Sequence, residues 1–265
     1  MFGIICMLLC CFFYALLNCL ARYLSTTIHP LTMVFYRNFI ALILILPFVI
    51  PKISAIINRE SFNRLNLARG IGGFLSMAFW NYGRIFLKEK LSFDKIIALT
   101  LGFFGTYVIL KPDVNGISLA TIYVLMSSLI WASTNIMVKK LTKSQDAYTI
   151  VFYMALIIAP ISFPWVIMHP YIPNLKELGI ITLIALSSNI AQILIAKAYT
   201  KTRVTVVIPF DFTRLIFGSM IAYIMFGEIL QLNTLIGSIM ILIAGYLVAY
   251  MELKRKNEKV VVEAS

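Results

Sequence analysis

Residues 2–21 read FGIICMLLCCFFYALLNCLA, and this stretch decides the fold. It contains no charged side chain, and its length is sufficient for a helix to cross the ~30 Å hydrocarbon core of a bilayer. The run is too long for the apolar region of a cleaved signal peptide, and no small-residue cleavage site precedes a soluble domain. It therefore predicts a membrane-spanning helix that stays in the protein.

The composition of the whole chain extends this prediction. Of its 265 residues, 61% are hydrophobic and only 13% are charged, and the mean hydropathy is +0.92. Soluble domains are about half apolar and about a quarter charged. A soluble fold of this length would leave too much apolar surface in water, so the sequence predicts an all-α integral membrane protein.

Further apolar runs give the expected membrane segments. Most of them have the roughly 17–25 residues that a helix needs to cross a bilayer. The run 70–83 has only 14 residues, about 21 Å of helix, so we expect it to re-enter or to lie at the interface. The runs lie at about 2–24, 31–50, 70–83, 93–110, 117–138, 147–168, 178–196, 204–226 and 233–251.

The net charge of +12 is concentrated in the loops between these runs. Basic loops beside apolar segments follow the positive-inside rule, which favours a membrane partner over nucleic acid. If residues 70–83 do not cross, every basic cluster lies on one side, and we expect the basic loops and the C-terminus to be cytoplasmic in a bacterial inner membrane. The clusters lie within 52–69, 84–95, 139–143, 197–203 and 254–259.

Motifs of enzymes and of metal sites are missing from the sequence. The cysteines Cys6, Cys10, Cys11 and Cys19 all lie in the first apolar run without zinc-like spacing to histidines, so we expect them to pack as small apolar residues. There is no P-loop, nucleophile elbow or H-E-x-x-H motif. The sequence therefore predicts no catalytic residue, no metal and no cofactor, and transport without ATP.

The chain also repeats itself, as transporters often do. A shift of 117 residues places Asn18 on Asn135, and beyond Tyr82 the shift becomes 139, which places Glu89 on Glu228. The two shifts differ by 22 residues, which is about the length of one membrane helix. The first repeat therefore lacks its fourth helix.

The predicted repeats have different degrees of completeness. Residues 1–111 form the incomplete first repeat, residues 117–251 form a second repeat of five helices, and residues 252–265 form a basic cytoplasmic tail. Repeats with an odd number of spans insert in opposite orientations. We therefore expect an inverted-repeat transporter bundle with one helix deleted from a five-plus-five plan, leaving eight or nine membrane segments.

Several motifs resemble the EamA family of the drug/metabolite transporter superfamily, and the similarity covers nearly all of residues 1–255. They are Val34-Phe35-Tyr36-Arg37-Asn38, Leu67-Ala68-Arg69-Gly70, Phe86-Leu87-Lys88-Glu89-Lys90-Leu91, Pro209-Phe210-Asp211-Phe212-Thr213-Arg214 and Met225-Phe226-Gly227-Glu228. The resemblance implies ten helices around a central cavity, and transport of amino acids, nucleotide-like metabolites, S-adenosylmethionine or related solutes. The missing fourth helix departs from this pattern and puts transport activity in question.

Charged residues inside apolar segments are the first candidates for a solute site. A charge there costs about 2.5–3.5 kcal/mol on insertion scales, so it needs a reason. Asp211 and Arg214 share a helix face, where they either line the cavity and bind a charged or zwitterionic solute or form only a mutual ion pair. Pro209, just upstream, predicts a kink. Arg37, near the start of its helix, either contacts the solute or extends to the interface.

Polar uncharged residues extend the candidate set. The repeat-related Asn18 and Asn135 either line the cavity or form hydrogen bonds between helices. Asn189 and Gln192 lie three residues apart and form a second polar face.

Aromatic residues complete the set, and the set as a whole points to a carrier. Trp131 and Tyr153 either stack on a planar or cationic solute or anchor the protein at the interface. The leading hypothesis is a secondary transporter of small organic metabolites, with S-adenosylmethionine or amino-acid-like solutes implied by the resemblance alone. The alternative is a decayed or partner-dependent membrane protein. The expected partners are a small-molecule solute and the lipid bilayer. The sequence leaves open whether the chain forms a homodimer.

Overall fold

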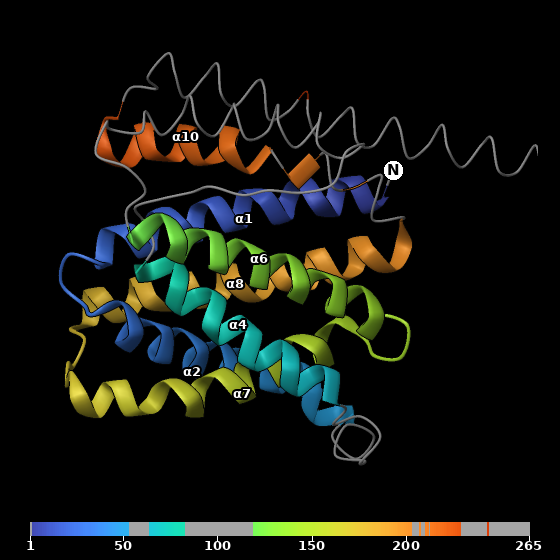
Figure 1. Ribbon diagram of the computed structural model, residues 1–265, viewed down its shortest axis with the longest axis horizontal. Coiled ribbons are helices and arrows are strands. Elements are labelled where there is room, and N and C mark those ends of the chain that lie inside the picture. The colour runs from blue at the N-terminus through green and yellow to red at the C-terminus, as the bar shows by residue number, and fades with distance from the viewer. Residues whose placement is uncertain are drawn as a thin grey trace, which may run out of the picture.

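The computed structural model describes residues 2–52, 64–82, 119–202, 207, 210–211, 213–228 and 243. The regular elements within these residues are all helices, packed side by side in a bundle (Figure 1), as the all-α prediction requires. They are α1 (Phe2–Leu24), α2 (Pro30–Val49), η1 (Ile50–Lys52), α4 (Arg64–Tyr82), α6 (Leu119–Leu141), α7 (Ala147–Met168), α8 (Leu175–Lys201) and α10 (Thr213–Phe226). The predicted segment 93–110, the segment 233–251 except residue 243, the tail 252–265 and Pro209 lie outside the described residues.

Helices α1, α2, α7 and α8 are long and apolar enough to cross a bilayer. They correspond to the predicted runs 2–24, 31–50, 147–168 and 178–196. Large apolar side chains cover their outer surfaces, including Ile43, Phe48 and Ile167, which are 50%, 59% and 68% exposed. Such a surface is stable in lipid rather than in water. The chain is therefore a multi-pass membrane protein.

Helix α4 is longer than the predicted run 70–83, but it is not among the described helices that are apolar enough to cross a bilayer. It begins at Arg64, six residues before the apolar run, and its 19 residues make about 28 Å of helix, close to the thickness of the hydrocarbon core. The early start was missed because the first two turns contain polar residues. One of them, Arg69, is nevertheless buried, and its Nη1 donates a hydrogen bond to the Ile150 carbonyl of α7 at 2.8 Å.

Helix α4 also packs alongside α6 (Figure 1). Midway along both helices, Ser76 Oγ donates to the Ser127 carbonyl at 3.0 Å, and Ser127 Oγ donates to the Ser76 carbonyl at 2.7 Å. Such bonds between membrane helices contribute about 0.6 kcal/mol each. The reciprocal pair fixes how the two helices face one another.

Capping groups set where two of the long helices begin. The Asp146 carboxylate accepts a hydrogen bond from the Thr149 backbone N–H at 3.3 Å and starts α7. At the other end of the bundle, Asn174 and Glu177 exchange side-chain-to-backbone hydrogen bonds of 2.9 Å and form a capping box at the start of α8. These caps satisfy N–H groups that a helix terminus otherwise leaves without partners.

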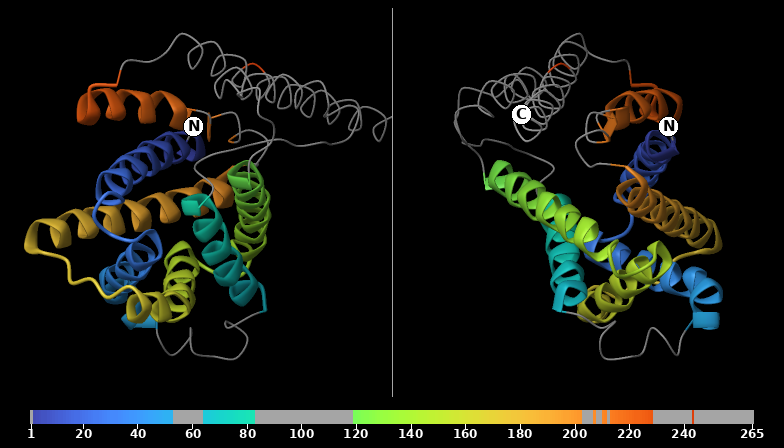
Figure 2. Two further views of the ribbon diagram at one scale, coloured as in Figure 1. Left: turned by 60° about the vertical axis from the view of Figure 1, so that its left-hand side comes forward. Right: turned by 90° about the vertical axis from the view of Figure 1, so that its right-hand side faces the viewer.

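The helices pack in an order that differs from their order in the chain. Helix α1 lies between α8 and α10, α2 contacts α7 and α8, and α4 contacts α6 and α7. Figure 2 shows α10 and α7 on opposite sides of the bundle. The main core joins α1 to α8 through Met7, Cys10, Ile184 and Ile195, all 2% exposed or less. All four cysteines of α1 are buried, which confirms their predicted packing role.

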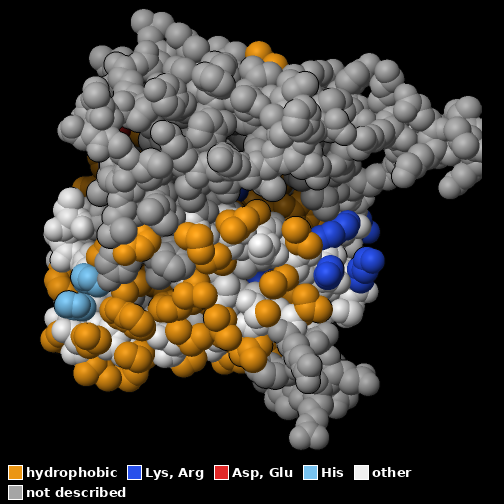
Figure 3. Space-filling view, in the orientation of Figure 1, with side chains coloured by type: hydrophobic (Ala, Val, Ile, Leu, Met, Phe, Trp, Pro, Cys, Tyr) orange, Lys and Arg blue, Asp and Glu red, His pale blue; other side chains and the backbone are white. Residues whose placement is uncertain are grey.

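The two ends of the bundle differ in charge (Figure 3). Lys139 and Lys140 lie in the last turn of α6, and Lys201 ends α8. At the opposite end, the rings of His29 and His169 stack with their centroids 4.2 Å apart. The described surface between these ends is largely hydrophobic in the view of Figure 3, as expected for a band in contact with lipid.

Candidate functional site

A cavity of about 420 Å³ lies inside the bundle. Its wall is formed by α1, α2, α4, α6 and α8, by Asp211 just before α10 and by Arg214 in the first turn of α10. The volume falls within the ~300–1,000 Å³ typical of small-molecule sites. The candidates that the structure brings together on this wall are Asn18, Arg37, Trp131, Asn135, Gln192, Asp211 and Arg214.

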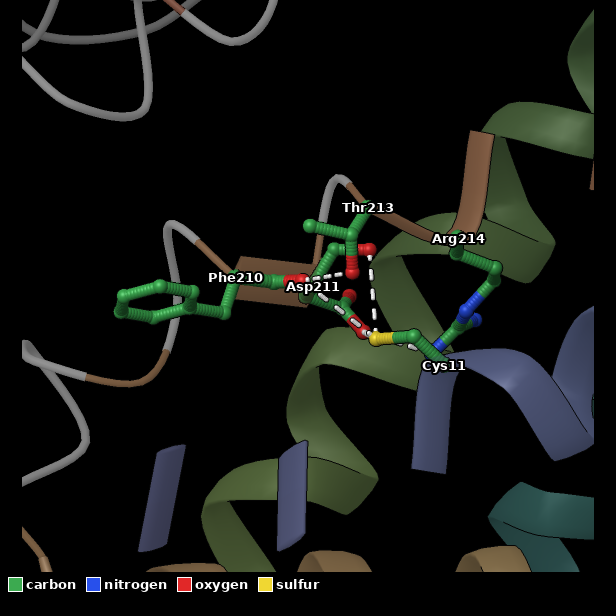
Figure 4. Close-up of polar contacts among 5 residues, drawn as sticks. All are labelled: Cys11, Phe210, Asp211, Thr213 and Arg214. Atoms are coloured by element: carbon green, nitrogen blue, oxygen red, sulfur yellow. Dashed lines mark hydrogen bonds and ion pairs between the residues drawn. The ribbon is translucent and has the colours of Figure 1, made fainter. Parts of the chain in front are cut away.

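Asp211 and Arg214 form an ion pair on the cavity wall. Arg214 Nη2 donates to Asp211 Oδ1 at 2.7 Å, and the guanidinium lies 4.4 Å from the centroid of the Tyr14 ring. The Cys11 thiol reaches the same carboxylate oxygen at 3.6 Å, and Figure 4 shows Cys11 and Arg214 converging on Asp211. These two residues therefore pair with each other and also line the cavity.

This ion pair remains accessible from the cavity. The Arg214 and Asp211 side chains are 24% and 39% exposed. Charges within a membrane protein are tolerated where they face a cavity and pair with one another. The pair therefore places one positive and one negative group on the cavity wall.

Aromatic rings form another part of the wall. Tyr14 and Trp131 contact each other edge to face, with ring centroids 5.9 Å apart and an interplanar angle of 86°. Tyr14 was not predicted, although a shift of 117 residues places it on Trp131. The repeat is the signal that could have identified Tyr14, because Asn18 and Asn135 are related by the same shift and also lie on the wall.

Gln192 is held in place by an arginine that sequence reasoning missed. Arg69 Nη2 donates to Gln192 Oε1 at 2.9 Å, while its Nη1 donates to the Ile150 carbonyl. Arg69 is only 3% exposed. It therefore positions Gln192 at the cavity and ties α4 to α7 and α8.

Arg37 points into the bundle and not to the interface. Its side chain lines the cavity, and Nη2 donates to the sulfur of Met77 on α4. Of the two alternatives left open by the sequence, extension to the interface does not occur in this conformation. Met77, Ser76, Ser127 and Ser188 also line the cavity and were not predicted.

Two candidates point elsewhere. Tyr153 is buried in a separate cluster with Ile45 and Val49. Asn189 Nδ2 donates to the Ala41 carbonyl at 2.8 Å, so it joins α8 to α2. Both residues are absent from the cavity wall. The cause is geometric, because a helix that is apolar all round gives no sign of which face is inward.

Comparison with known proteins shows the family of this chain. The EamA-like transporter family matches residues 1–84 and 118–250. An S-adenosylmethionine uptake transporter of Rickettsia bellii is 24% identical, with 91% of each chain covered. A riboflavin transporter of Vibrio cholerae is 27% identical over 66% of this chain and 59% of its own length.

A solved crystal structure shares the fold. It superposes with a TM-score of 0.71 and 11% sequence identity, and the match covers 96% of this chain and 98% of the other. This likeness concerns the fold alone, whereas the family match spans most of the sequence. The chain therefore belongs to the EamA-like transporter family.

Proposed function

We propose that this chain is a secondary transporter that moves small organic metabolites across a bacterial inner membrane by alternating access, without ATP. The observation that carries the proposal is the 420 Å³ cavity, whose wall combines the Asp211–Arg214 ion pair with the rings of Tyr14 and Trp131. Charged groups that face a cavity within a membrane bundle are typical of a solute pathway.

The wall favours a zwitterionic solute with a planar part. Asp211 and Arg214 offer one charge of each sign, and the aromatic rings offer surfaces for stacking. S-adenosylmethionine joins an amino-acid group to a planar base, so it uses both features. The name of the Rickettsia bellii relative agrees with this choice. We take S-adenosylmethionine, or a smaller amino-acid-like solute, as the first candidate substrate.

Two inverted repeats supply the alternating-access mechanism. The repeat-related pairs Tyr14 with Trp131 and Asn18 with Asn135 meet at one cavity, which is where the interface between inverted repeats places a substrate. We assign the end with Lys139 and Lys140 to the cytoplasm by the positive-inside rule. The end with the stacked histidines then faces the periplasm.

Uptake by cells that express the chain tests this function. The substrates are labelled S-adenosylmethionine, riboflavin and a set of amino acids, each supplied separately. We expect uptake of at least one of them above vector-only cells, and loss of that uptake in Asp211→Asn and Arg214→Gln. Lys140→Gln is the matched control, because Lys140 is exposed and absent from the cavity wall. Equal uptake in all three variants would exclude the Asp211–Arg214 pair from the solute site.

A second candidate is a membrane protein that needs a partner chain. It is favoured by the 22-residue difference between the repeat shifts and by the family match, which leaves residues 85–117 outside. The discriminating experiment compares the natural chain with a version that carries a restored fourth helix. Transport by the restored version alone would support the second candidate over the first.

A further inference from the structure

Three residues of the cavity wall carry buried polar atoms without a hydrogen-bond partner among the described residues. Tyr14 Oη, Arg37 Nε and Arg214 Nε are buried and have no hydrogen-bond partner among the described residues. All three residues line the same cavity. About 90% or more of buried polar groups in proteins are hydrogen-bonded, so a cluster of exceptions needs an explanation. A bound solute that accepts hydrogen bonds at this position provides one.

Arg37 differs from the other arginines near the cavity. Arg69 is satisfied by the Ile150 carbonyl and by Gln192, and Arg214 is paired with Asp211. The described contact of the Arg37 guanidinium is with the Met77 sulfur, a weak and neutral acceptor. Its charge is therefore not balanced by a carboxylate in the described part of the protein.

The charges on the wall do not cancel. Asp146, Glu177, Asp211 and Glu228 are the acidic residues in the described part of the chain, and among them Asp211 alone lines the cavity. Among the described residues of the wall, Arg37 and Arg214 against Asp211 leave one positive charge in excess. An uncompensated charge away from water is costly. A guanidinium presents N–H donors in the planar arrangement that fits a carboxylate.

We propose that Arg37 is a further anion-binding residue of this cavity and that the transported solute carries a carboxylate, which pairs with Arg37 beside the ion pair that Arg214 makes with Asp211. The solute carboxylate then provides the negative charge that Arg37, on α2, lacks among the described residues. The remainder of the solute then extends toward Trp131 and the Asp211–Arg214 pair. This inference rests on the proposed transport function for its biological meaning, but the positive charge of the cavity is testable without any substrate.

Trp131 is a built-in probe of that charge, because it lines the same cavity as Arg37. With Trp80→Phe and Trp165→Phe as background, fluorescence of the purified protein reports Trp131 alone. The measurement is quenching by iodide, an anion, relative to quenching by neutral acrylamide. We expect Arg37→Gln to lower iodide quenching at least twofold with acrylamide quenching unchanged, and Arg37→Lys to retain it. An unchanged ratio of iodide to acrylamide quenching in Arg37→Gln overturns the proposal.

A transport experiment then tests the carboxylate directly. Uptake of labelled S-adenosylmethionine is challenged with unlabelled S-adenosylmethionine or with its decarboxylated analogue, which lacks only the carboxylate. We expect the analogue to compete about tenfold more weakly in the natural protein, a loss typical of a hydrogen-bonded charge pair, and equally well in Arg37→Gln. Equal competition in the natural protein contradicts the role of Arg37. An absence of all uptake instead contradicts the substrate assignment, and the quenching result still decides the charge of the cavity.

Discussion

Arg22 in the last turn of α1 pairs with Glu228, the second residue after α10. The guanidinium donates two hydrogen bonds to the carboxylate, at 2.5 and 2.7 Å, and also lies 4.7 Å from the centroid of the Phe226 ring. Glu228 reaches this position because Gly227 turns the chain with a φ of 67°, a conformation that glycine adopts without strain. The pair lies at the end of the bundle that carries the stacked histidines.

This ion pair is expected to hold that end of the cavity closed. Arg22→Gln should therefore increase the rate at which a water-soluble thiol reagent labels a cysteine placed at Asn18, in a background without the natural cysteines. Both side chains are 47% exposed, so we expect a change of about two- to fivefold, in line with exposed ion pairs. Arg22→Lys keeps the charge and should label slowly. An unchanged rate in Arg22→Gln would remove the pair from any gating role.

The same contact should survive mild acidification. Hydrogen bonds from Arg22 lower the pKa of the Glu228 carboxyl below its usual 4.5. The stabilisation is therefore present at neutral pH and is lost only as the pH falls through this lowered pKa. In the thiol-labelling experiment, the protein with a cysteine at Asn18 and with Arg22 and Glu228 intact should keep its slow rate, relative to a free thiol at the same pH, down to about pH 5. Acceleration well above that pH would contradict the assignment.

The fold is expected to lose stability below pH 6.5 because of His29. Burial, with a smaller effect of His169, lowers the pKa of His29 from the usual 6.5. The unfolded chain then binds a proton at a higher pH than the folded chain, so stability falls as the pH drops from 6.5 toward the folded pKa. His29→Gln should flatten the dependence of the melting temperature on pH between about 7.5 and 5.5. An identical slope in this variant would show that other groups cause the dependence.

Close packing of α4 on α7 at Gly70 gives a test of the fold. A Cβ at Gly70 would lie 2.6–2.9 Å from atoms of the Ile157 side chain, including its Cβ. Gly70→Ala should therefore lower the free energy of unfolding by about 1–3 kcal/mol, as overpacking does. Gly179→Ala is the matched control, since nothing lies within 4 Å of its added Cβ. Equal stability of the two variants would contradict the contact between α4 and α7.

Topology is tested by single cysteines at the two ends of the bundle. Lys143 lies in the exposed loop between α6 and α7, and Ile172, which is 92% exposed, lies between α7 and α8. In cells that express a version without the natural cysteines, we expect a membrane-impermeant reagent to label Ile172→Cys from outside. Lys143→Cys should react only after the membrane is opened. The reverse pattern would invert the orientation assigned from the basic residues.

The long helices could be predicted because their apolar runs are unbroken. Helix α1 matches its predicted range 2–24, and α7 matches 147–168. The first turns of α4 could not be predicted in this way, because Arg69 reads as a loop residue unless its partners are known. Those partners, the Ile150 carbonyl and Gln192, come from helices distant in the sequence.

The sequence predicted several polar residues of the cavity wall, but it did not predict which aromatic residues face the cavity. Asp211, Arg214 and Asn135 stood out because polar residues are costly in apolar segments. Tyr153 also lies within an apolar segment, yet it packs against Ile45 and Val49. The rotation of its helix about the helix axis depends on contacts with other helices, and these contacts could not be predicted from the sequence. Tyr14 could have been predicted if the shift of 117 residues had been used to compare aromatic residues as well as polar ones.

The central claim is that solute passes through the cavity between α1, α2, α6 and α8. Two adjacent positions on α6 test it with the same side chain: Asn135 lines the cavity, whereas Ile136 is 62% exposed on the outer surface. The measurement is uptake of labelled S-adenosylmethionine into ATP-free liposomes that contain the purified protein. The account predicts that Asn135→Trp abolishes uptake and that Ile136→Trp leaves it close to that of the natural protein. Undiminished uptake by Asn135→Trp would contradict it.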